Sequence, residues 1–333
     1  MEHRKLPKLD LNITNRCNFK CVHCAFNSGV LKMTELSVKE IKKILEETKE
    51  LGGEKIDITG GEPTLRQDLN EIIKIAKSLD YKVELVTNGS LLNKNKLREL
   101  QEIGLDSIAI SLDGPDYESY NKIRKVDKKT YSRVIKTIKE ALELGIYTKI
   151  NTVAFDSNLK NLEKITEFCI KNRINEHGIY YFTPIGRGYN GKQKAIEPIK
   201  WLKFIRRKLL KYHNQIKLSI EVPIIEKDFP KTEIDCILKE DPYHLQILPD
   251  GRVYPCVILD YYNKPIGDLK KTSVKEIWDN KKLWDACLKD ICSDIFEKNC
   301  GFCVNFSNFN FKKYKKDYKF VCPLRKFLVQ DLK

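Results

Sequence analysis

The sequence has 333 residues and a formal net charge of +15, from 61 basic and 46 acidic side chains. A chain of this length can bury a sizeable core, and its hydrophobic content of 41% is typical of a globular protein of about two domains. No uncharged apolar run approaches the roughly 18 residues needed to cross a bilayer. The first ten residues, MEHRKLPKLD, hold no apolar signal core, so we expect no export, no membrane partner and a cytoplasmic location.

Two explanations compete for the basic charge. One is an anionic substrate or partner that a basic surface attracts. The other is a heat-adapted composition in which solvated lysines are common. We favour the second, because the lysines are spread along many segments and the nearest approach to an aromatic-interleaved basic tract, residues 311–320, is short. We therefore expect no nucleic-acid partner.

Strands and helices are predicted to alternate from residue 8 to residue 183. The first strand follows from the alternation of Leu9, Leu11 and Ile13, and a Cys-rich loop leads from it to about Gly29. Further strands are predicted over residues 55–59, 83–87, 107–112, 147–155 and 177–184. Helices are predicted over residues 37–52, 68–79, 93–103, 130–145 and 161–172, the first with a capping box of Ser37 and Glu40. Six βα units of this kind indicate an α/β fold with a parallel sheet and helices outside it.

The pattern changes after Pro184. A Gly-rich loop, IGRGYNG, precedes a basic helix predicted over residues 197–212. A hairpin is predicted over residues 243–259 with its turn at residues 249–251, and a helix over residues 273–290. The tail that follows is rich in cysteine and aromatic residues.

The strongest chemical signal is the spacing of Cys17, Cys21 and Cys24 in the loop after the first strand. Thiolates select soft metals such as zinc, copper(I) or the iron of iron–sulfur clusters. Structural zinc sites and ferredoxin clusters take four protein ligands, whereas three cysteines on one loop leave an iron of a 4Fe–4S cluster open to a small molecule. The alternative is a zinc knuckle that His23 completes.

Three further motifs stand where predicted strands end: GGEP at residues 60–63, TNG at residues 87–89 and SLDG at residues 111–114. The carboxyl ends of parallel strands meet at one edge of a sheet, and ligands of such sheets bind there. The Cys-rich loop follows the first strand and so lies at the same edge. The sequence therefore predicts one active site built by these four loops.

With a C-x3-C-x2-C loop after the first strand and GGEP after the second, residues 8 to about 183 resemble the radical SAM superfamily. The resemblance implies a partial (β/α)6 barrel in which Cys17, Cys21 and Cys24 bind a 4Fe–4S cluster. S-adenosylmethionine (SAM) would chelate the open iron, and an electron from a donor such as ferredoxin or flavodoxin would cleave it. The resulting 5′-deoxyadenosyl radical would abstract hydrogen from a substrate. Because the cofactors supply this chemistry, the resemblance assigns no catalytic side chain.

The resemblance also implies particular SAM contacts. The amino group of SAM would meet the loop of Gly60, Gly61, Glu62 and Pro63, whose glycines allow a close approach. Ser111 would bind SAM from the end of the fourth strand. Alternatively, Ser111 is simply a polar group at a strand end.

Four more contacts follow from the same resemblance. Arg124 would bind the SAM carboxylate, since a guanidinium suits that anion. His23 would border the adenine, and Asn151 and Val153 on the fifth strand would contact the ribose and adenine. The alternatives are a surface salt bridge for Arg124 and a polar strand end for Asn151.

The second half resembles the SPASM/twitch extension of the superfamily in its PDGRVYPC hairpin, its IGDL segment and its helix with EIW. The resemblance implies at least one auxiliary 4Fe–4S cluster in this part of the chain. Its expected ligands are Cys236, Cys256, Cys300 and Cys303, with Cys322 as a further candidate.

The spacing departs from the full SPASM pattern after Cys303. One or two auxiliary clusters are therefore compatible with it, and the roles of Cys287, Cys292 and Cys322 stay open. A structural zinc ribbon is the alternative. We expect three parts: a radical SAM core over 1–195, a connecting helix and strand over 196–232, and a Cys-rich α+β auxiliary-cluster domain over 233–333.

Three functions follow from these features. We favour a maturase-like enzyme that modifies or oxidises a peptide or protein. Only about nine residues precede the first strand, so we expect no N-terminal domain for binding a leader peptide, which counts against this function. The second is a small-molecule oxidoreductase or decarboxylase in the biosynthesis of a cofactor, such as a tetrapyrrole, or of a sugar-like metabolite. The third is a non-enzymatic zinc-binding protein, against which the GGEP and SLDG loops argue.

Overall fold

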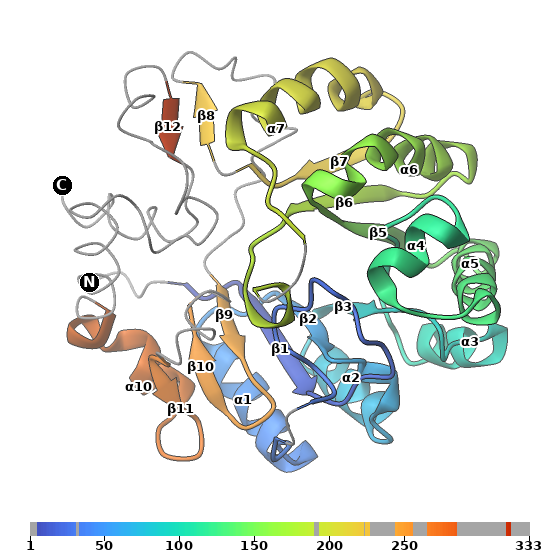
Figure 1. Cartoon of the computed structure of the whole chain (residues 1–333). Helices are drawn as coiled ribbons and strands as arrows, with labels where there is room; N and C mark the ends of the chain where they lie inside the picture. Colours follow the sequence, from blue (N-terminus) through green and yellow to red (C-terminus); the bar gives the residue numbers. More distant parts are fainter. Residues whose placement is uncertain are drawn as a thin grey trace.

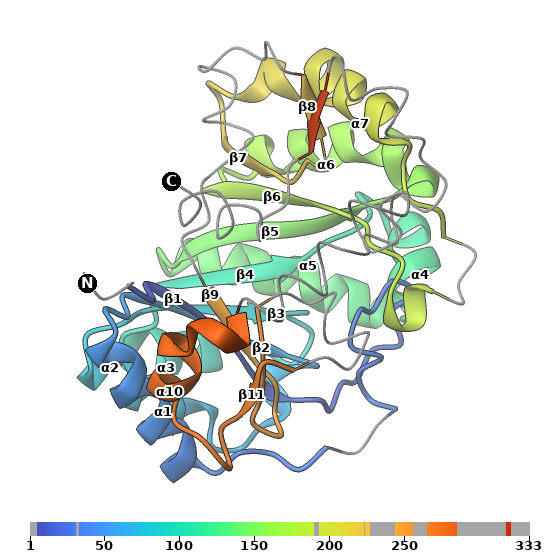
Figure 2. The same ribbon diagram turned by 90° about the vertical axis from the view of Figure 1, so that its left-hand side faces the viewer.

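The parts of the chain that the computed structural model describes are residues 5–30, 33–189, 193–222, 224–226, 244–255, 265–284 and 318–320. Within them, one ten-stranded sheet has the order β11-β10-β9-β1-β2-β3-β4-β5-β6-β7. The sheet curves, and helices cover its convex side (Figures 1 and 2). The predicted α/β architecture with a barrel-like parallel sheet is confirmed.

The strands from β1 to β7 are all parallel to their neighbours. On the other side of β1, β9 is also parallel, and β10 and β11 continue the sheet antiparallel. A separate antiparallel pair joins β8 and β12. The sheet is therefore wider than the six predicted strands. The strands are β1 (Lys8–Thr14), β2 (Lys55–Gly60), β3 (Lys82–Thr87), β4 (Ser107–Ser111), β5 (Tyr147–Ala154), β6 (Glu176–Tyr181), β7 (Lys217–Ile220), β8 (Ile224–Glu226), β9 (His244–Ile247), β10 (Arg252–Tyr254), β11 (Gly267–Asp268) and β12 (Tyr318–Phe320).

The helices that were predicted between strands are present, and the capping box of Ser37 and Glu40 at the first of them is confirmed. A short helix, α4, precedes α5 and was not predicted. Near the end of the described chain, α10 lies beside α1, where the amide of Val274 donates to Glu47 Oε2 at 2.7 Å (Figure 2). No helix in the described ranges has the length and apolarity to cross a membrane. The helices are α1 (Val38–Glu50), α2 (Leu69–Ser78), α3 (Lys94–Glu102), α4 (Tyr117–Arg124), α5 (Lys128–Glu143), α6 (Leu159–Lys171), α7 (Pro198–Phe204) and α10 (Val274–Asp279).

The helix predicted over residues 197–212 changes its pitch half-way. It is α-helical over α7, widens into a π-helical turn over Ile205–Leu209 and tightens into a 3-10 turn over Leu210–Tyr212. Ile205 and Leu209, at the two ends of the π-helical turn, are both buried, so the change of pitch lies on the packed side of this segment.

The two faces of the sheet differ in chemistry. Side chains that face the helices are apolar and fully buried, as at Leu9 and Ile56. Alternate residues on the concave side are polar, because successive side chains of a strand point to opposite faces. Lys8 Nζ lies 3.0 Å from Asp57 Oδ2, and Lys149 Nζ lies 3.5 Å from Glu176 Oε1. Charged pairs therefore occupy the concave face near the amino-terminal ends of these strands.

One polar side chain lies buried among the apolar ones between the sheet and α6. His177 is fully buried, with Nε2 3.0 Å from Thr152 Oγ1 and Nδ1 3.1 Å from Thr166 Oγ1. Burial lowers the pKa of the His177 imidazole to about 3, from an ordinary value of 6.5. The folded protein therefore keeps this ring neutral at pH values at which the unfolded chain protonates it.

We expect His177 to make the fold acid-sensitive. Between pH 6.5 and about pH 3 the unfolded chain binds a proton that the folded chain excludes, so stability is complete above pH 6.5 and falls as the pH falls. The expected contribution of His177 to the loss in unfolding free energy from pH 6.5 to about pH 4.5 is about 2 kcal/mol. Urea unfolding should show this loss in the wild type and a correspondingly smaller one in His177→Gln. Equal losses in both proteins would contradict the assignment.

Candidate functional site

The Cys-rich loop follows β1 and carries three free thiols, those of Cys17, Cys21 and Cys24. Each sulfur accepts a hydrogen bond: that of Cys17 from the amide of Phe19 at 3.4 Å, that of Cys24 from the amide of Ser28 at 3.3 Å, and that of Cys21 from Arg124 Nη1 at 3.6 Å. Hydrogen bonds of this kind favour the thiolate form that ligates metal.

Burial acts against the charged form of the same thiols. It raises the pKa of Cys17 to about 12 and also raises the pKa of Cys21. Metal ligands must be deprotonated, so a metal centre that binds here displaces these protons. Without a bound cation, Cys17 and Cys21 are therefore neutral thiols near pH 7.

The GGEP loop lies directly on the backbone that leads into Cys17. The amide of Gly61 donates to Thr14 O at 2.7 Å, and the amide of Glu62 donates to Arg16 O at 2.8 Å. A Cβ on Gly60 would stand 2.3 Å from Thr14 O, and one on Gly61 would stand 2.2 Å from Arg16 O. The two glycines are thus required by the close approach of the Cys-rich loop.

Glu62 connects two of the four loops at this edge. Its carboxylate is fully buried, and Oε1 accepts hydrogen bonds from the amide of Thr64 at 3.2 Å and from the hydroxyl of Thr87 at 2.6 Å. The other oxygen accepts the amide of Asn88 at 2.7 Å. Asn88 Nδ2 donates in turn to Asn18 Oδ1 at 2.8 Å, in the Cys-rich loop. The GGEP, TNG and Cys-rich loops therefore form one hydrogen-bonded unit.

A buried ion pair supports Cys21 from the other side. Arg124, at the end of α4, donates through Nε to Asp113 Oδ2, and Asp113 Oδ1 accepts the amide of Val153 at 2.8 Å. Arg124 is 8% exposed and Asp113 is fully buried. Burial opposes the charge of Arg124, but the Asp113 carboxylate outweighs it and raises the pKa of the guanidinium. The salt bridge expected as an alternative for Arg124 therefore exists, but it lies in the interior and not on the surface.

Ser111, Asn151 and Val153 come to the same edge. Ser111 ends β4 and pairs in register with Asn151 on β5, so their side chains lie on one face of the sheet. The ring of His23 packs against Phe155 with 5.8 Å between centroids, and its Nε2 lies 3.8 Å from Asp113 Oδ2. Burial lowers the pKa of His23 to about 4, so the imidazole is neutral near pH 7.

Some buried polar side-chain atoms at this edge have no hydrogen-bond partner among the described residues. They include Asn151 Oδ1, His23 Nδ1 and Ser28 Oγ. Buried polar groups are normally hydrogen-bonded, so unpaired ones indicate a ligand or water that completes the site. Amino, hydroxyl and heteroaromatic groups such as those of SAM would satisfy them. The residues present therefore fit the predicted cofactor.

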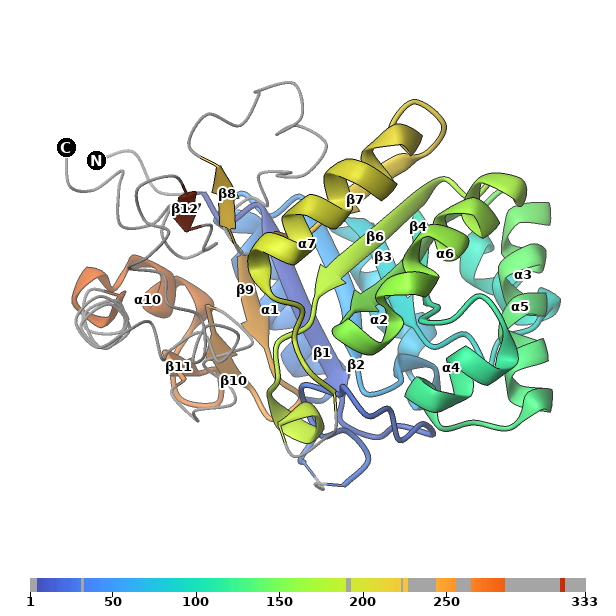
Figure 3. The ribbon, with the colours of Figure 1, turned by 45° about the horizontal axis from the view of Figure 1, so that its top comes forward.

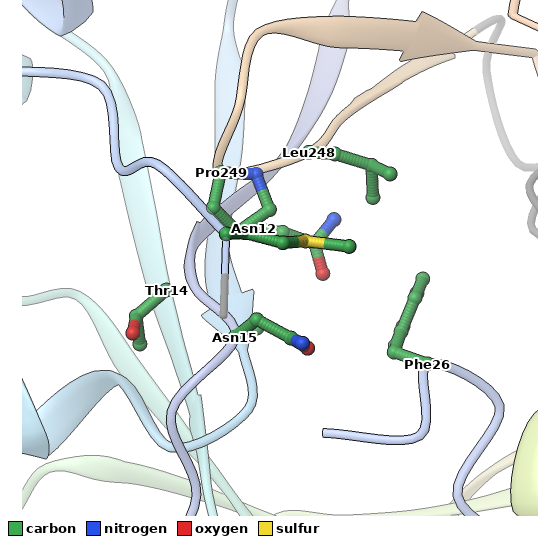
Figure 4. Close-up of a pocket in the computed structure, with 8 residues that line it drawn as sticks. Asn12, Thr14, Asn15, Phe26, Leu248 and Pro249 are labelled. Atoms are coloured by element: carbon green, nitrogen blue, oxygen red, sulfur yellow. The ribbon is translucent and has the colours of Figure 1, made fainter. Parts of the chain in front are cut away.

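A small pocket separates the Cys-rich loop from the turn between β9 and β10 (Figure 4). Its cavity volume of about 10 Å³ has room for no more than a water-sized group and is far below the roughly 300 Å³ or more of typical small-molecule sites. Asn12 donates through Nδ2 to Ile247 O at 3.2 Å, which joins β1 to β9 beside the pocket. Its lining residues are Asn12, Thr14, Asn15, Phe26, Met33, Gly60, Leu248 and Pro249.

Two zinc sites were considered as alternatives, a knuckle at the Cys-rich loop and a ribbon in the C-terminal half. Within the described ranges, no group of three or more His, Cys, Asp and Glu side chains is placed to hold a single metal ion. The cysteines assigned to the auxiliary site, together with those of unassigned role, lie outside the described residues: Cys236, Cys256, Cys287, Cys292, Cys300, Cys303 and Cys322.

Comparisons with known proteins decide the family. The radical SAM superfamily model matches residues 11–169, and a model of an iron–sulfur cluster-binding domain, SPASM, matches residues 236–304. A probable GTP 3',8-cyclase of Saccharolobus islandicus is 32% identical over 284 residues, which are 82% of this chain and 90% of that protein. The chain belongs to the radical SAM superfamily. A probable GTP 3',8-cyclase of Sulfurisphaera tokodaii is 34% identical over 203 residues, and this match covers 59% of the chain but only 64% of the relative.

Solved structures of radical SAM enzymes share the fold. One is Streptococcus suis SuiB bound to precursor peptide SuiA, with a TM-score of 0.72 and 19% identity. The match includes 85% of this chain and 67% of SuiB. Another is anSMEcpe with bound AdoMet and Cp18Cys peptide, with a TM-score of 0.64 and 18% identity. That match includes 93% of this chain and 95% of anSMEcpe. At these identities the likeness concerns the fold.

Membership of the radical SAM superfamily confirms several predictions together. The chain is an iron–sulfur enzyme with a C-terminal SPASM domain, and its cofactors are SAM and 4Fe–4S clusters, at least one of them auxiliary. Such an enzyme uses a substrate and a reductant. The individual ligands, the SAM contacts and the domain bounds stay predictions. Sequence reasoning missed Asp113, Asn88 and Arg187, although the SLDG and TNG motifs and the Gly-rich loop contain them.

The role of Glu62 leads to a prediction about this edge. Glu62→Gln keeps the size of the side chain, but an amide nitrogen cannot accept the hydrogen bond from the amide of Asn88. A buried donor left unpaired costs about 1–3 kcal/mol, so we expect the unfolding free energy to fall by that amount. The same change weakens the hydrogen bonds that connect Glu62 through Asn88 to the Cys-rich loop. We therefore expect the affinity for SAM to fall as well, while the iron content stays at the wild-type level.

The exposed Glu118 provides the matched control. Glu118→Gln removes the same charge without touching the loops, so its unfolding free energy and its SAM affinity should match those of the wild type. Urea unfolding and equilibrium dialysis measure the two quantities. The assignment of Glu62 fails if the two variants behave alike.

Proposed function

We propose that the chain is a hydrogen-abstracting radical SAM enzyme that modifies or oxidises a peptide or protein. The observation that carries the radical chemistry is the gathering of the three thiols and of the GGEP, TNG and SLDG loops at one edge of the sheet. In this proposal Cys17, Cys21 and Cys24 hold the N-terminal cluster. The remaining assignments concern SAM, which would be bound by residues 60–63, Ser111, Asn151, Val153 and His23.

The bound cluster and SAM together supply a 5′-deoxyadenosyl radical when an electron arrives. The protein's own residues shape the space in which this happens. Phe155 and Phe182, 0% and 1% exposed, pack edge to face with 5.5 Å between centroids behind His23 and form an apolar wall. Such a wall excludes water from the site. The guanidinium of Arg124 already donates to Cys21 and Asp113. To bind the SAM carboxylate, Arg124 would have to give up one of these partners; otherwise a different residue would have to donate to that carboxylate.

Two features support a peptide or protein substrate. The SPASM model matches residues 236–304, and the fold resembles SuiB and anSMEcpe, both of which have been crystallised with peptides.

A second candidate is a nucleotide-like small molecule. It is favoured by the relatives named as probable GTP 3',8-cyclases, one of which matches over 90% of its own length. In an anaerobic assay of reductant, SAM and holoenzyme, stimulation of 5′-deoxyadenosine formation by GTP would support this candidate. Stimulation by a peptide encoded beside the gene, and none by GTP, would support the first.

Iron and sulfide analysis tests the cofactor assignment. After anaerobic reconstitution, we expect a Cys17/Cys21/Cys24 triple-Ala variant to contain about four fewer irons per chain than the wild type. About four irons left in the variant would indicate one auxiliary cluster, and about eight would indicate two. An iron content equal to that of the wild type would refute the N-terminal cluster, and zinc in place of iron would make the C-terminal half a structural scaffold.

A further inference from the structure

The Gly-rich loop after β6 lies against the Cys-rich loop. Residues 183–189 leave the end of β6, and a 3-10 turn at Gly186–Gly188 brings them beside the loop that follows β1 (Figures 1 and 3). About 160 residues separate the two segments in sequence. We name residues 183–189 the strap.

Arg187 makes the main contacts of the strap. Its backbone amide donates to Cys24 O at 2.9 Å. Its guanidinium donates through Nη2 to Ser28 O at 2.6 Å and through Nε to Asn27 Oδ1 at 3.3 Å. The side chain and the backbone of one residue therefore hold both ends of the turn from Cys24 to Ser28.

This turn fixes the sulfur of Cys24. The amide of Ser28 donates to Cys24 Sγ at 3.3 Å, so the direction of the thiol depends on where Ser28 lies. Asn27, between them, has a φ of 49°, in the left-handed region that residues other than glycine adopt at a cost. The bonds from Arg187 compensate for this strain, because they are made only while the turn keeps this shape.

The glycines of the strap permit the contact. Gly186 has a φ of 56°, and a Cβ on it would stand 2.1 Å from Ala25 O and 2.6 Å from Cys24 O. Any side chain at residue 186 would therefore push the strap away from the Cys-rich loop. This close approach gives the Gly-rich sequence a structural reason that its composition alone did not reveal.

We infer that Arg187 is a positioning residue for Cys24, and that the strap holds this ligand in place for the N-terminal cluster. The inference rests on the proposed role of Cys24 as a cluster ligand. Cys21 has a comparable brace in Arg124, so two arginines from later in the chain hold the loop at two of its three cysteines. Outer partners of metal ligands usually contribute to the affinity for the metal.

The test follows the release of iron from the anaerobic holoenzyme to ferrozine, an Fe(II) chelator. The iron that the triple-Ala variant lacks defines the N-terminal pool. In Arg187→Met, we expect the rate of iron release from this pool to be at least roughly tenfold higher than in the wild type. The variant's electron paramagnetic resonance signal from the same cluster should also broaden or shift. Arg187→Lys keeps the positive charge but loses the paired N–H donors of the guanidinium. Its rate of iron release should therefore lie between those of the wild type and Arg187→Met.

Two controls keep the test decisive. Arg133→Met removes an exposed arginine that bonds only Thr130 among the described residues, and its iron should leave at the wild-type rate. Gly186→Ala should reproduce the loss with Arg187 still present. Wild-type release and spectra in Arg187→Met would overturn the inference, as would equal acceleration in Arg133→Met. If the triple-Ala variant lacked no iron, the proposed function itself would fail, whatever Arg187 does.

Discussion

Replacing Cys17, Cys21 or Cys24 with Ala is expected to abolish reductive cleavage of SAM. The three thiols lie on one loop at the sheet edge that carries the GGEP, TNG and SLDG loops. Among the described residues no other cysteine lies on this loop, so none is placed to replace a lost ligand. We expect 5′-deoxyadenosine formation to fall at least about 1,000-fold, equivalent to about 4 kcal/mol in activation free energy. The measurement is product formation by the anaerobic holoenzyme with excess reductant. Turnover retained in any of the three variants would refute the assignment of that cysteine.

Cys169 is the matched control for these variants. It is the fourth cysteine of the described chain, and it is fully buried in α6 within the apolar core. Burial raises the pKa of its thiol, which suits a small apolar side chain and not a ligand. Cys169→Ala should lower the unfolding free energy by about 1 kcal/mol through the small void it leaves, and SAM cleavage should be unchanged.

The sequence predicted those parts of the site that lie in consecutive residues. The Cys-rich, GGEP, TNG and SLDG loops each follow a strand, and the parallel sheet dictates that they meet. What joins the loops could not be predicted, because it depends on pairs far apart in sequence. Glu62 and Asn88 are 26 residues apart, and Arg187 and Ser28 are 159 apart.

Helix α4 shows why some local structure was also missed. Its buried residues are Tyr120, Ile123 and Arg124, so a charged side chain occupies the face that an apolar pattern would mark. The arginine is tolerated there because Asp113 pairs with it. The buried ion pair thus masked the periodicity that makes other helices, such as α1, easy to predict from sequence.

Removing the carboxylate of Asp113 is the second change with a large expected effect. Asp113→Asn takes away the counter-charge of Arg124, whose guanidinium stays in the interior at 8% exposure. Breaking a buried ion pair by removing one partner typically costs about 3–5 kcal/mol, and we expect a loss of this size in the unfolding free energy. Urea unfolding of the anaerobic protein measures it.

A double variant separates the ion pair from the rest of the site. Asp113→Asn combined with Arg124→Met leaves neither charge in the interior, so most of the lost stability should return. If the effects of the two single changes simply added, the pair would not be coupled, contrary to the hydrogen bond from Arg124 Nε to Asp113 Oδ2.

The double variant then reports what Arg124 does for the cluster. Its fold is restored, but the donor that lies 3.6 Å from Cys21 Sγ is gone, together with its positive charge. Hydrogen bonds and cations beside the ligand sulfurs stabilise the reduced cluster, so its reduction potential should become more negative, by roughly 60 mV for each 1.4 kcal/mol of stabilisation lost. A redox titration followed by electron paramagnetic resonance, with the triple-Ala variant to identify the signal, measures this shift. An unchanged potential would mean that Arg124 serves Asp113 and the fold alone, which would leave Cys21 dependent on the loop for its position.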